Sequence, residues 1–180
     1  MIELYCGKGK GKTTAAIGLC VRAAGNNIPV IIAQFLKDDT SGEMEILSGL
    51  EGVKLIHTDE FYGFVCHMTE IEKEKTKESL CGMLDRIEKE IERLTQPASS
   101  VTDDITAVVV LDELTHACNF DFIDEDKVCE MFKKYPNVEF VVTGREPSDK
   151  LCQIADYISE INQIRHPYQK GIDARKGIEF

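Results

Sequence analysis

The sequence lacks the long apolar runs and the cysteine patterns that mark membrane and zinc-binding proteins. No apolar run approaches about 18 residues and no charged-then-apolar leader opens the chain, so we expect neither a membrane span nor a signal peptide. The seven cysteines form no C-x-x-C pair and no close Cys/His quartet, which argues against a zinc site. We therefore expect a cytoplasmic protein in which most cysteines are buried as small hydrophobic residues.

Basic residues are also scarce, with 21 Lys and Arg against 32 Asp and Glu and a net charge of -11. Such a chain repels nucleic acid phosphates and anionic lipid unless its basic residues are concentrated in one place. Lys8, Lys10, Lys12 and Arg22 are concentrated in this way. The cluster suits a small polyphosphate and argues against nucleic acid or a membrane as the partner. The length of 180 residues fits one domain, residues 1–180.

Short apolar runs alternate with helix-length segments along the chain. This alternation predicts an α/β fold, a mostly parallel sheet with helices on both faces. The longest helix should begin at a capping box formed by Thr69 and Glu72. Gln96 to Asp104 has the composition of a surface loop. The expected strands are Ile2 to Tyr5, Val30 to Phe35, Val53 to His57, Ala107 to Leu111 and Val138 to Thr143, and the expected helices are Thr14 to Ala24, Thr69 to Leu94, Glu125 to Tyr135 and Ser148 to Ala155.

The first predicted strand leads into a glycine- and lysine-rich loop and then an alanine-rich helix, which is the order that a P-loop requires. Glycines let backbone N–H groups surround phosphate oxygens, while the helix directs its positive dipole end at the same anion. Lys12 should reach the outer phosphates, and Thr13 stands where a hydroxyl normally meets Mg²⁺. Cys6 replaces the usual first glycine. The predicted ATP-binding residues are Gly7, Lys8, Gly9, Lys10, Gly11, Lys12, Thr13, Thr14 and Arg22.

A second part of the site is predicted where the apolar run Ala107 to Leu111 ends in Asp112 and Glu113. A strand of this kind can lie beside the P-loop strand and deliver carboxylates at its C-terminal end. Mg²⁺ prefers oxygen ligands and keeps several waters, so these carboxylates can bind it directly or through water. A buried strand followed by a charged turn is the alternative reading of this stretch, and the P-loop favours the metal site.

Several further stretches carry a more specific pattern. They are Arg22-Ala23-Ala24-Gly25, Gln34-Phe35-Leu36-Lys37, Leu111-Asp112-Glu113-Leu114-Thr115-His116-Ala117, Val142-Thr143-Gly144-Arg145, Arg165-His166-Pro167-Tyr168-Gln169-Lys170-Gly171-Ile172 and Lys176-Gly177-Ile178-Glu179-Phe180. Together with Gly7 to Thr14, they resemble the P-loop corrinoid adenosyltransferases, also called ATP:cob(I)alamin adenosyltransferases. The stretches run in family order from residue 7 to residue 180, and the tail is the most specific because common P-loop enzymes lack it. Lys8 replaces the asparagine usual in the family's loop.

The resemblance implies a P-loop NTPase-like (RecA-like) fold and transfer of the 5'-deoxyadenosyl group of ATP to the cobalt(I) of a reduced corrinoid, with triphosphate leaving. Cobalt(I) is a powerful nucleophile, so the protein needs only to position ATP, stabilise the leaving group and exclude water. Lys12, Thr13 and Glu113 are the residues expected to serve catalysis. Thr13 and Glu113 are the expected Mg²⁺ ligands, supported by Asp112. The resemblance also implies a homodimer and a cellular electron donor.

The middle of the chain departs from the family pattern. Members cover the lower face of the corrin with aromatic side chains, and here Phe64 is the candidate for that role, while the second aromatic position falls near Cys66. An ordinary core or loop role for the aromatics is an equal alternative. Arg145 and His166 are further candidates for corrinoid contacts, against surface ion pairing for Arg145 and a structural role for His166. Many members also carry an N-terminal helix before the first strand.

Two other functions remain open on the sequence alone. A P-loop ATPase or small-molecule kinase would use the outer phosphate and release ADP in place of triphosphate. A non-catalytic module would bind ATP or corrinoid without turnover.

Overall fold

A computed structural model describes residues 1–37, 42–58, 60–95 and 105–178 of the chain. They form one six-stranded sheet in the order β3-β2-β4-β5-β1-β6, and every neighbouring pair is parallel. The predicted α/β fold with a parallel sheet is therefore confirmed. The strands are β1 (Ile2–Cys6), β2 (Val30–Gln34), β3 (Val53–Ile56), β4 (Ala107–Asp112), β5 (Val138–Thr143) and β6 (Tyr157–Glu160).

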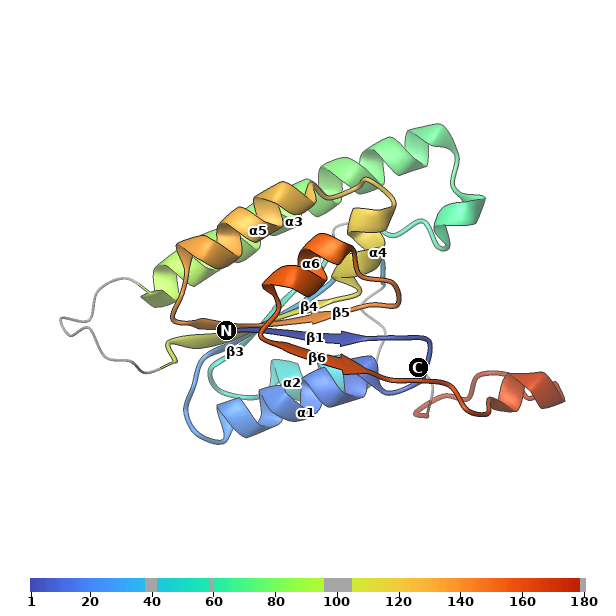
Figure 1. Cartoon of the computed structure of the whole chain (residues 1–180), viewed down its shortest axis with the longest axis horizontal. Helices are drawn as coiled ribbons and strands as arrows, with labels where there is room; N and C mark the ends of the chain where they lie inside the picture. Colours follow the sequence, from blue (N-terminus) through green and yellow to red (C-terminus); the bar gives the residue numbers. More distant parts are fainter. Residues whose placement is uncertain (38–41, 59, 96–104, 179–180) are drawn as a thin grey trace.

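Helices cover both faces of the sheet, as Figure 1 shows. One face packs against α1 and α2, where Ala16, Cys20, Met44 and Leu47 are buried against the strands. The other face packs against the remaining helices, and α3 alone buries Leu80, Ile87 and Ile91 there. The helices are α1 (Lys12–Ala24), α2 (Gly42–Ser48), α3 (Glu70–Thr95), α4 (Leu114–Asn119), α5 (Glu125–Lys134) and α6 (Asp149–Ile154), with short 3-10 helices η1 (Val65–His67) and η2 (Pro167–Lys170).

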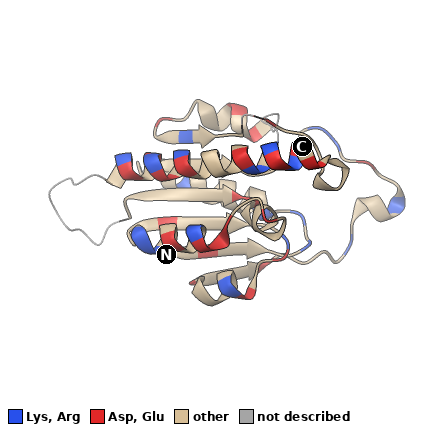
Figure 2. Cartoon of the chain, turned by 90° about the horizontal axis from the view of Figure 1, so that it is seen from above, with Lys and Arg blue, Asp and Glu red and all other residues tan. Residues whose placement is uncertain are grey.

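The predicted elements begin and end within about two residues of the observed ones, a usual margin for such boundaries. The capping box at the start of α3 is present, because Thr69 N donates to Glu72 Oε2 at 2.7 Å and Glu72 N donates to Thr69 Oγ1 at 3.3 Å. Acidic and basic residues are interspersed along α3 (Figure 2). The predicted loop at Gln96 to Asp104 lies outside the described residues.

Strand β6 and helices α2 and α4 were not predicted. All four residues of β6 are exposed, so the strand has no buried apolar pattern, and it is held by pairing with β1 alone. Helices α2 and α4 have seven and six residues, too few to show a helical period. In the described part of the chain, no helix is long and apolar enough to cross a bilayer.

All strands point their carboxyl ends to one side of the molecule, where parallel α/β sheets bind ligands. Two segments extend beyond that end in Figure 1, namely the stretch that holds η1 and the C-terminal segment, residues 161–178. Most side chains of the C-terminal segment are exposed. The P-loop is one of the loops at this end of the sheet.

Candidate active site

The P-loop joins β1 to α1 and rests on the start of the C-terminal segment. Gly7 has a φ of 97°, and a Cβ added there would lie 2.5 Å from the carbonyl oxygen of Ile161. A Cβ on Gly9 would lie 2.7 Å from the same oxygen, to which Gly9 N donates at 2.7 Å. Glycine is therefore required at both positions. The close approach of Ile161 excludes a side chain at Gly7 and at Gly9, and the positive φ disfavours one at Gly7 as well.

Lys12 begins α1, directly after Gly11, whose φ of 119° lets the chain turn into the helix. The lysine side chain folds back over the loop and donates from Nζ to Gly9 O at 3.0 Å. The residue is only 8% exposed. Burial lowers the pKa of Lys12 from its ordinary value, although Glu113 and Asp112 act in the opposite direction. A buried ammonium inside a loop of backbone N–H groups is suited to an incoming anion.

Asp112, the last residue of β4, is the centre of a buried network. Its side chain is fully buried. Its Oδ1 accepts hydrogen bonds from Thr13 Oγ1 at 2.9 Å and from Thr143 Oγ1 at 2.6 Å. Its Oδ2 accepts from Lys37 Nζ at 2.6 Å and from Gln34 Nε2 at 3.4 Å. The network therefore joins the ends of β2, β4 and β5 to the first turn of α1.

The strand order corrects one expectation about this network. β4 does not lie beside the P-loop strand β1, because β5 lies between them. Thr143 at the end of β5 bridges the resulting gap, since it donates to Asp112 and its Oγ1 accepts from Glu113 N at 2.9 Å. The carboxylate of Asp112 still reaches Thr13, so the two predicted parts of the site do meet.

Glu113 turns away from Asp112 and contacts a different partner. It has a left-handed backbone, φ 60°, and its Oε2 pairs with Nδ1 of His116 one turn later in α4. Burial raises the pKa of Glu113, but the hydrogen bond and charge of His116 and the charges of Lys37 and Lys12 outweigh burial and leave it lowered. Glu113 is therefore a carboxylate at neutral pH, near both lysines.

The remaining residues of the predicted ATP site lie at different distances from this centre. Lys8, Lys10 and Thr14 are exposed around the loop, and Lys8 pairs with Glu146 at 3.2 Å. Arg22 is in the last turn of α1, about 15 Å along the axis from Lys12 at 1.5 Å per residue. The structure therefore does not bring Arg22 to the loop.

The three corrinoid candidates lie on separate segments at the carboxyl end of the sheet. Phe64 precedes η1, is 78% exposed and meets His67 edge-on at 6.4 Å between ring centroids. Arg145 is exposed, and its carbonyl accepts from Gly7 N at 3.1 Å. His166 uses Nδ1 to accept from Tyr168 N at 3.2 Å, which caps η2. The structure therefore gives His166 a structural contact.

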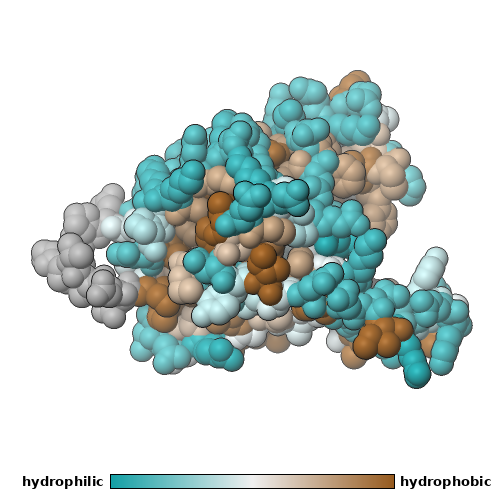
Figure 3. Space-filling model, viewed as in Figure 1, coloured by the Kyte–Doolittle hydropathy of each residue, from teal (hydrophilic) through white to brown (hydrophobic). Residues whose placement is uncertain are grey.

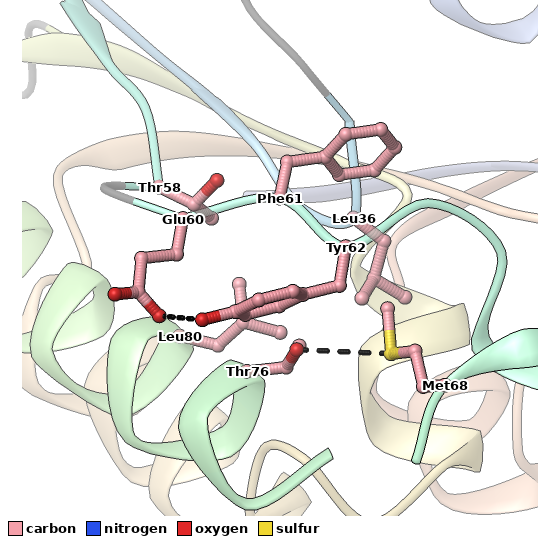
Figure 4. Close-up of a pocket in the computed structure, with 8 residues that line it drawn as sticks. All are labelled: Leu36, Thr58, Glu60, Phe61, Tyr62, Met68, Thr76 and Leu80. Atoms are coloured by element: carbon pink, nitrogen blue, oxygen red, sulfur yellow. Dashed lines mark hydrogen bonds between the residues drawn. The ribbon is translucent and has the colours of Figure 1, made fainter. Parts of the chain in front are cut away.

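The aromatic stretch before η1 also lines a small hollow, drawn in Figure 4. Tyr62 lies over Thr76 and Leu80 of α3 and pairs with Glu60, while Phe61 points away from that helix (Figure 4). Tyr62 is thus packed as a structural residue, whereas Phe61 and Phe64 present exposed rings.

Three residues of the network were not predicted as site residues from the sequence, namely Gln34, Lys37 and Thr143. The motifs Gln34 to Lys37 and Val142 to Arg145 marked their positions, but only the sheet order brings them to Asp112. The set of Thr13 hydroxyl and Asp112 carboxylate fits Mg²⁺, which prefers oxygen ligands. Gln34 Oε1 is buried without a hydrogen-bond partner, so it can accept from a water that such an ion holds.

Comparison with known proteins identifies a family whose sequences are similar to this chain. Residues 1–180 match the family described as ATP:corrinoid adenosyltransferase BtuR/CobO/CobP. A corrinoid adenosyltransferase of Sinorhizobium is 31% identical over 185 residues, which cover 100% of this chain and 80% of that protein. Corrinoid adenosyltransferases of Escherichia coli K12 and Salmonella typhimurium are each 28% identical, with 100% of this chain and 85% of each relative covered. Given this full-length match and the P-loop site, the chain belongs to the ATP:corrinoid adenosyltransferase family, a family of transferase enzymes.

Proposed function

We propose that this enzyme transfers the 5'-deoxyadenosyl group of ATP to the cobalt(I) of a reduced corrinoid. In this reaction cobalt supplies the electron pair, a cobalt–carbon bond forms at the 5' carbon, and the bond from that carbon to oxygen breaks. Triphosphate leaves with the electrons of the broken bond. The observation that carries the proposal is the Thr13–Asp112 contact beside the P-loop, in a chain that matches the family over its full length.

The protein's part in this reaction is to hold a triphosphate that departs as an anion. Lys12 and the loop N–H groups that are not already bonded to a carbonyl, as Gly7 N and Gly9 N are, would neutralise it, and the first turn of α1 would add its dipole. Thr13 and Asp112 would hold Mg²⁺, with Glu113 joining them once its carboxylate leaves His116. The ion would supply further positive charge to the leaving group. No side-chain nucleophile is required, because cobalt(I) is the nucleophile.

The corrinoid would bind beyond the carboxyl end of the sheet, where both the η1 stretch and the C-terminal segment extend (Figure 1). The exposed ring of Phe64 is suited to cover an apolar corrin face. Arg145 and His166 are proposed contacts for the polar groups at the rim of the corrin. We further propose a cytoplasmic homodimer that receives electrons from a cellular reductase. The exposed Ile164 and Tyr168 of the C-terminal segment support a subunit contact.

The test is an anaerobic incubation of the protein with ATP, Mg²⁺ and chemically reduced cobalamin. The visible spectrum should change to that of a light-sensitive adenosyl corrinoid, and triphosphate should appear in equal amount. Release of ADP without that spectrum would instead identify an ATPase or kinase. Binding of ATP with neither product would identify a non-catalytic module.

A further inference from the structure

The ammonium of Lys37 lies between the two groups that are proposed to hold the divalent ion. Its Nζ is 2.6 Å from Asp112 Oδ2 and 3.3 Å from Thr13 Oγ1. A P-loop hydroxyl and a carboxylate at the end of a neighbouring strand are oxygen ligands of the kind that Mg²⁺ takes. A side-chain cation therefore lies between the two proposed ligands of the divalent ion.

The backbone before Lys37 is shaped to aim it there. β2 ends at Gln34, Phe35 is fully buried, and Leu36 then adopts a left-handed conformation with a φ of 54°. A branched, non-glycine residue in this region is strained, and such strain persists only where the surrounding structure determines it. The turn at Leu36 brings Lys37 across the end of β4, where its charge offsets the buried carboxylate of Asp112.

Lys37 and a divalent ion cannot hold this place together. Thr13, Thr143, Gln34 and Lys37 already supply donors to both oxygens of Asp112. An ion that binds Asp112 and Thr13 must displace a donor, and the ammonium is the one that it also repels by charge. Lys37 has a flexible four-carbon stem and a side chain that is 32% exposed, so it is free to swing aside.

We propose that Lys37 is a nucleotide-binding residue that holds the cation position before nucleotide binds and moves onto the triphosphate when nucleotide arrives, which opens that position to Mg²⁺. The inference rests on the proposed function, because it requires a triphosphate at the P-loop. The triphosphate would then contact two lysines, Lys12 at the start of α1 and Lys37 after the end of β2. Mg²⁺ would also enter with the nucleotide, since Lys37 would compete with the ion alone for Asp112 and Thr13.

The experiment measures binding without turnover, using tripolyphosphate as the probe for calorimetry and Mn²⁺ as the probe for electron paramagnetic resonance. Lys37→Met should lower the affinity for tripolyphosphate by about tenfold or more in EDTA, the value of one hydrogen bond to a charged group. Without nucleotide, the same variant should bind Mn²⁺ about tenfold more tightly than the parent protein. Lys54→Met makes the same charge change on β3 and should alter neither value.

A double variant separates phosphate binding from simple neutralisation of Asp112. Lys37→Met with Asp112→Asn leaves no buried unpaired carboxylate, so it should fold even if the single variant does not. Weak tripolyphosphate binding by the double variant in EDTA would support the proposal. Restored binding would overturn it, as would unchanged binding of both probes by Lys37→Met. If the parent protein bound neither tripolyphosphate nor ATP, the proposed function itself would fail.

Discussion

The P-loop and the C-terminal segment both carry family motifs at the same end of the sheet, but they differ in what surrounds them. The P-loop glycines pack against the backbone of Ile161, and Lys12 and Asp112 are buried beside them. In the C-terminal segment Ile164 is 92% exposed and Tyr168 is 74% exposed, and Figure 3 shows apolar side chains on this protruding part. Contacts within the chain explain the first motif. The exposed side chains of the second motif fit the proposed contact with a ligand or a partner.

The largest expected effect concerns the buried lysine of the P-loop. Lys12→Met should weaken ATP binding by roughly a hundredfold or more, as expected for two hydrogen bonds to charged groups at about 1.5 kcal/mol each. The same variant should unfold at a higher temperature, because a buried ammonium is replaced by a buried thioether. Calorimetry measures both values. A lower unfolding temperature would show that Lys12 stabilises the fold and does not serve phosphate alone.

The sign of the pH dependence follows from the lowered pKa of Lys12. Because its folded pKa lies below its unfolded value, the charged lysine destabilises the folded protein at neutral pH, and this effect fades as pH rises through the folded pKa. The difference in stability between Lys12→Met and the parent protein should therefore be largest near pH 7 and smaller in alkaline buffer. A difference that grows with pH would contradict this assignment.

An effect of comparable size, on stability in place of binding, is expected from glycines on the two sides of the comparison. A Cβ added to Gly144 would lie 1.6 Å from Thr115 Oγ1, so Gly144→Ala should destabilise the protein by about 3 kcal/mol. Gly171→Ala, in the C-terminal segment, meets open space, so only its φ of 71° opposes alanine and the loss should be smaller, about 1 kcal/mol. Gly82→Ala, within α3, is the control and should be neutral or slightly stabilising. Equal losses at Gly144 and Gly171 would remove the contrast.

The C-terminal segment should matter for turnover more than for stability. Tyr168→Ser should change the free energy of unfolding by about 0.5 kcal/mol or less, because the side chain is exposed. If the segment contacts the corrinoid or a second subunit, the same change should raise the KM for corrinoid or weaken self-association. Steady-state kinetics and analytical ultracentrifugation measure these two effects. An unfolding temperature that drops by several degrees would mean that the segment is packed in solution.

The smallest effect requires no mutation of the site. Burial raises the pKa of Cys20 and Cys118 to about 12, so their thiols should react with a disulfide reagent only when the fold opens. Cys66 in η1 and Cys81 in α3 are exposed and should react first. Mass spectrometry after brief labelling would order the sites, and early labelling of Cys20 would show that the α1 face opens readily. The prediction that most cysteines are buried is confirmed, since Cys6, Cys20, Cys118 and Cys129 are buried.

The sequence predicted those parts of the fold that have a local pattern. Strands β2, β4 and β5 are mostly apolar and buried at every position, so they were predicted, whereas exposed β6 depends on its neighbour and was not. Likewise, the P-loop and Asp112 follow from motifs. Lys37 and Thr143 join them only through the order of strands, a long-range property that no short stretch encodes.

The hydrogen bond from Gly9 N to Ile161 O links the C-terminal segment thermodynamically to the P-loop. A phosphate that takes this N–H must compete with the carbonyl at which the C-terminal segment begins. A ligand or partner that fixes the C-terminal segment would then change the affinity for nucleotide. By thermodynamic reciprocity, nucleotide would change the affinity for that ligand or partner by the same factor. The two motifs, so different in their surroundings, would then share one binding equilibrium.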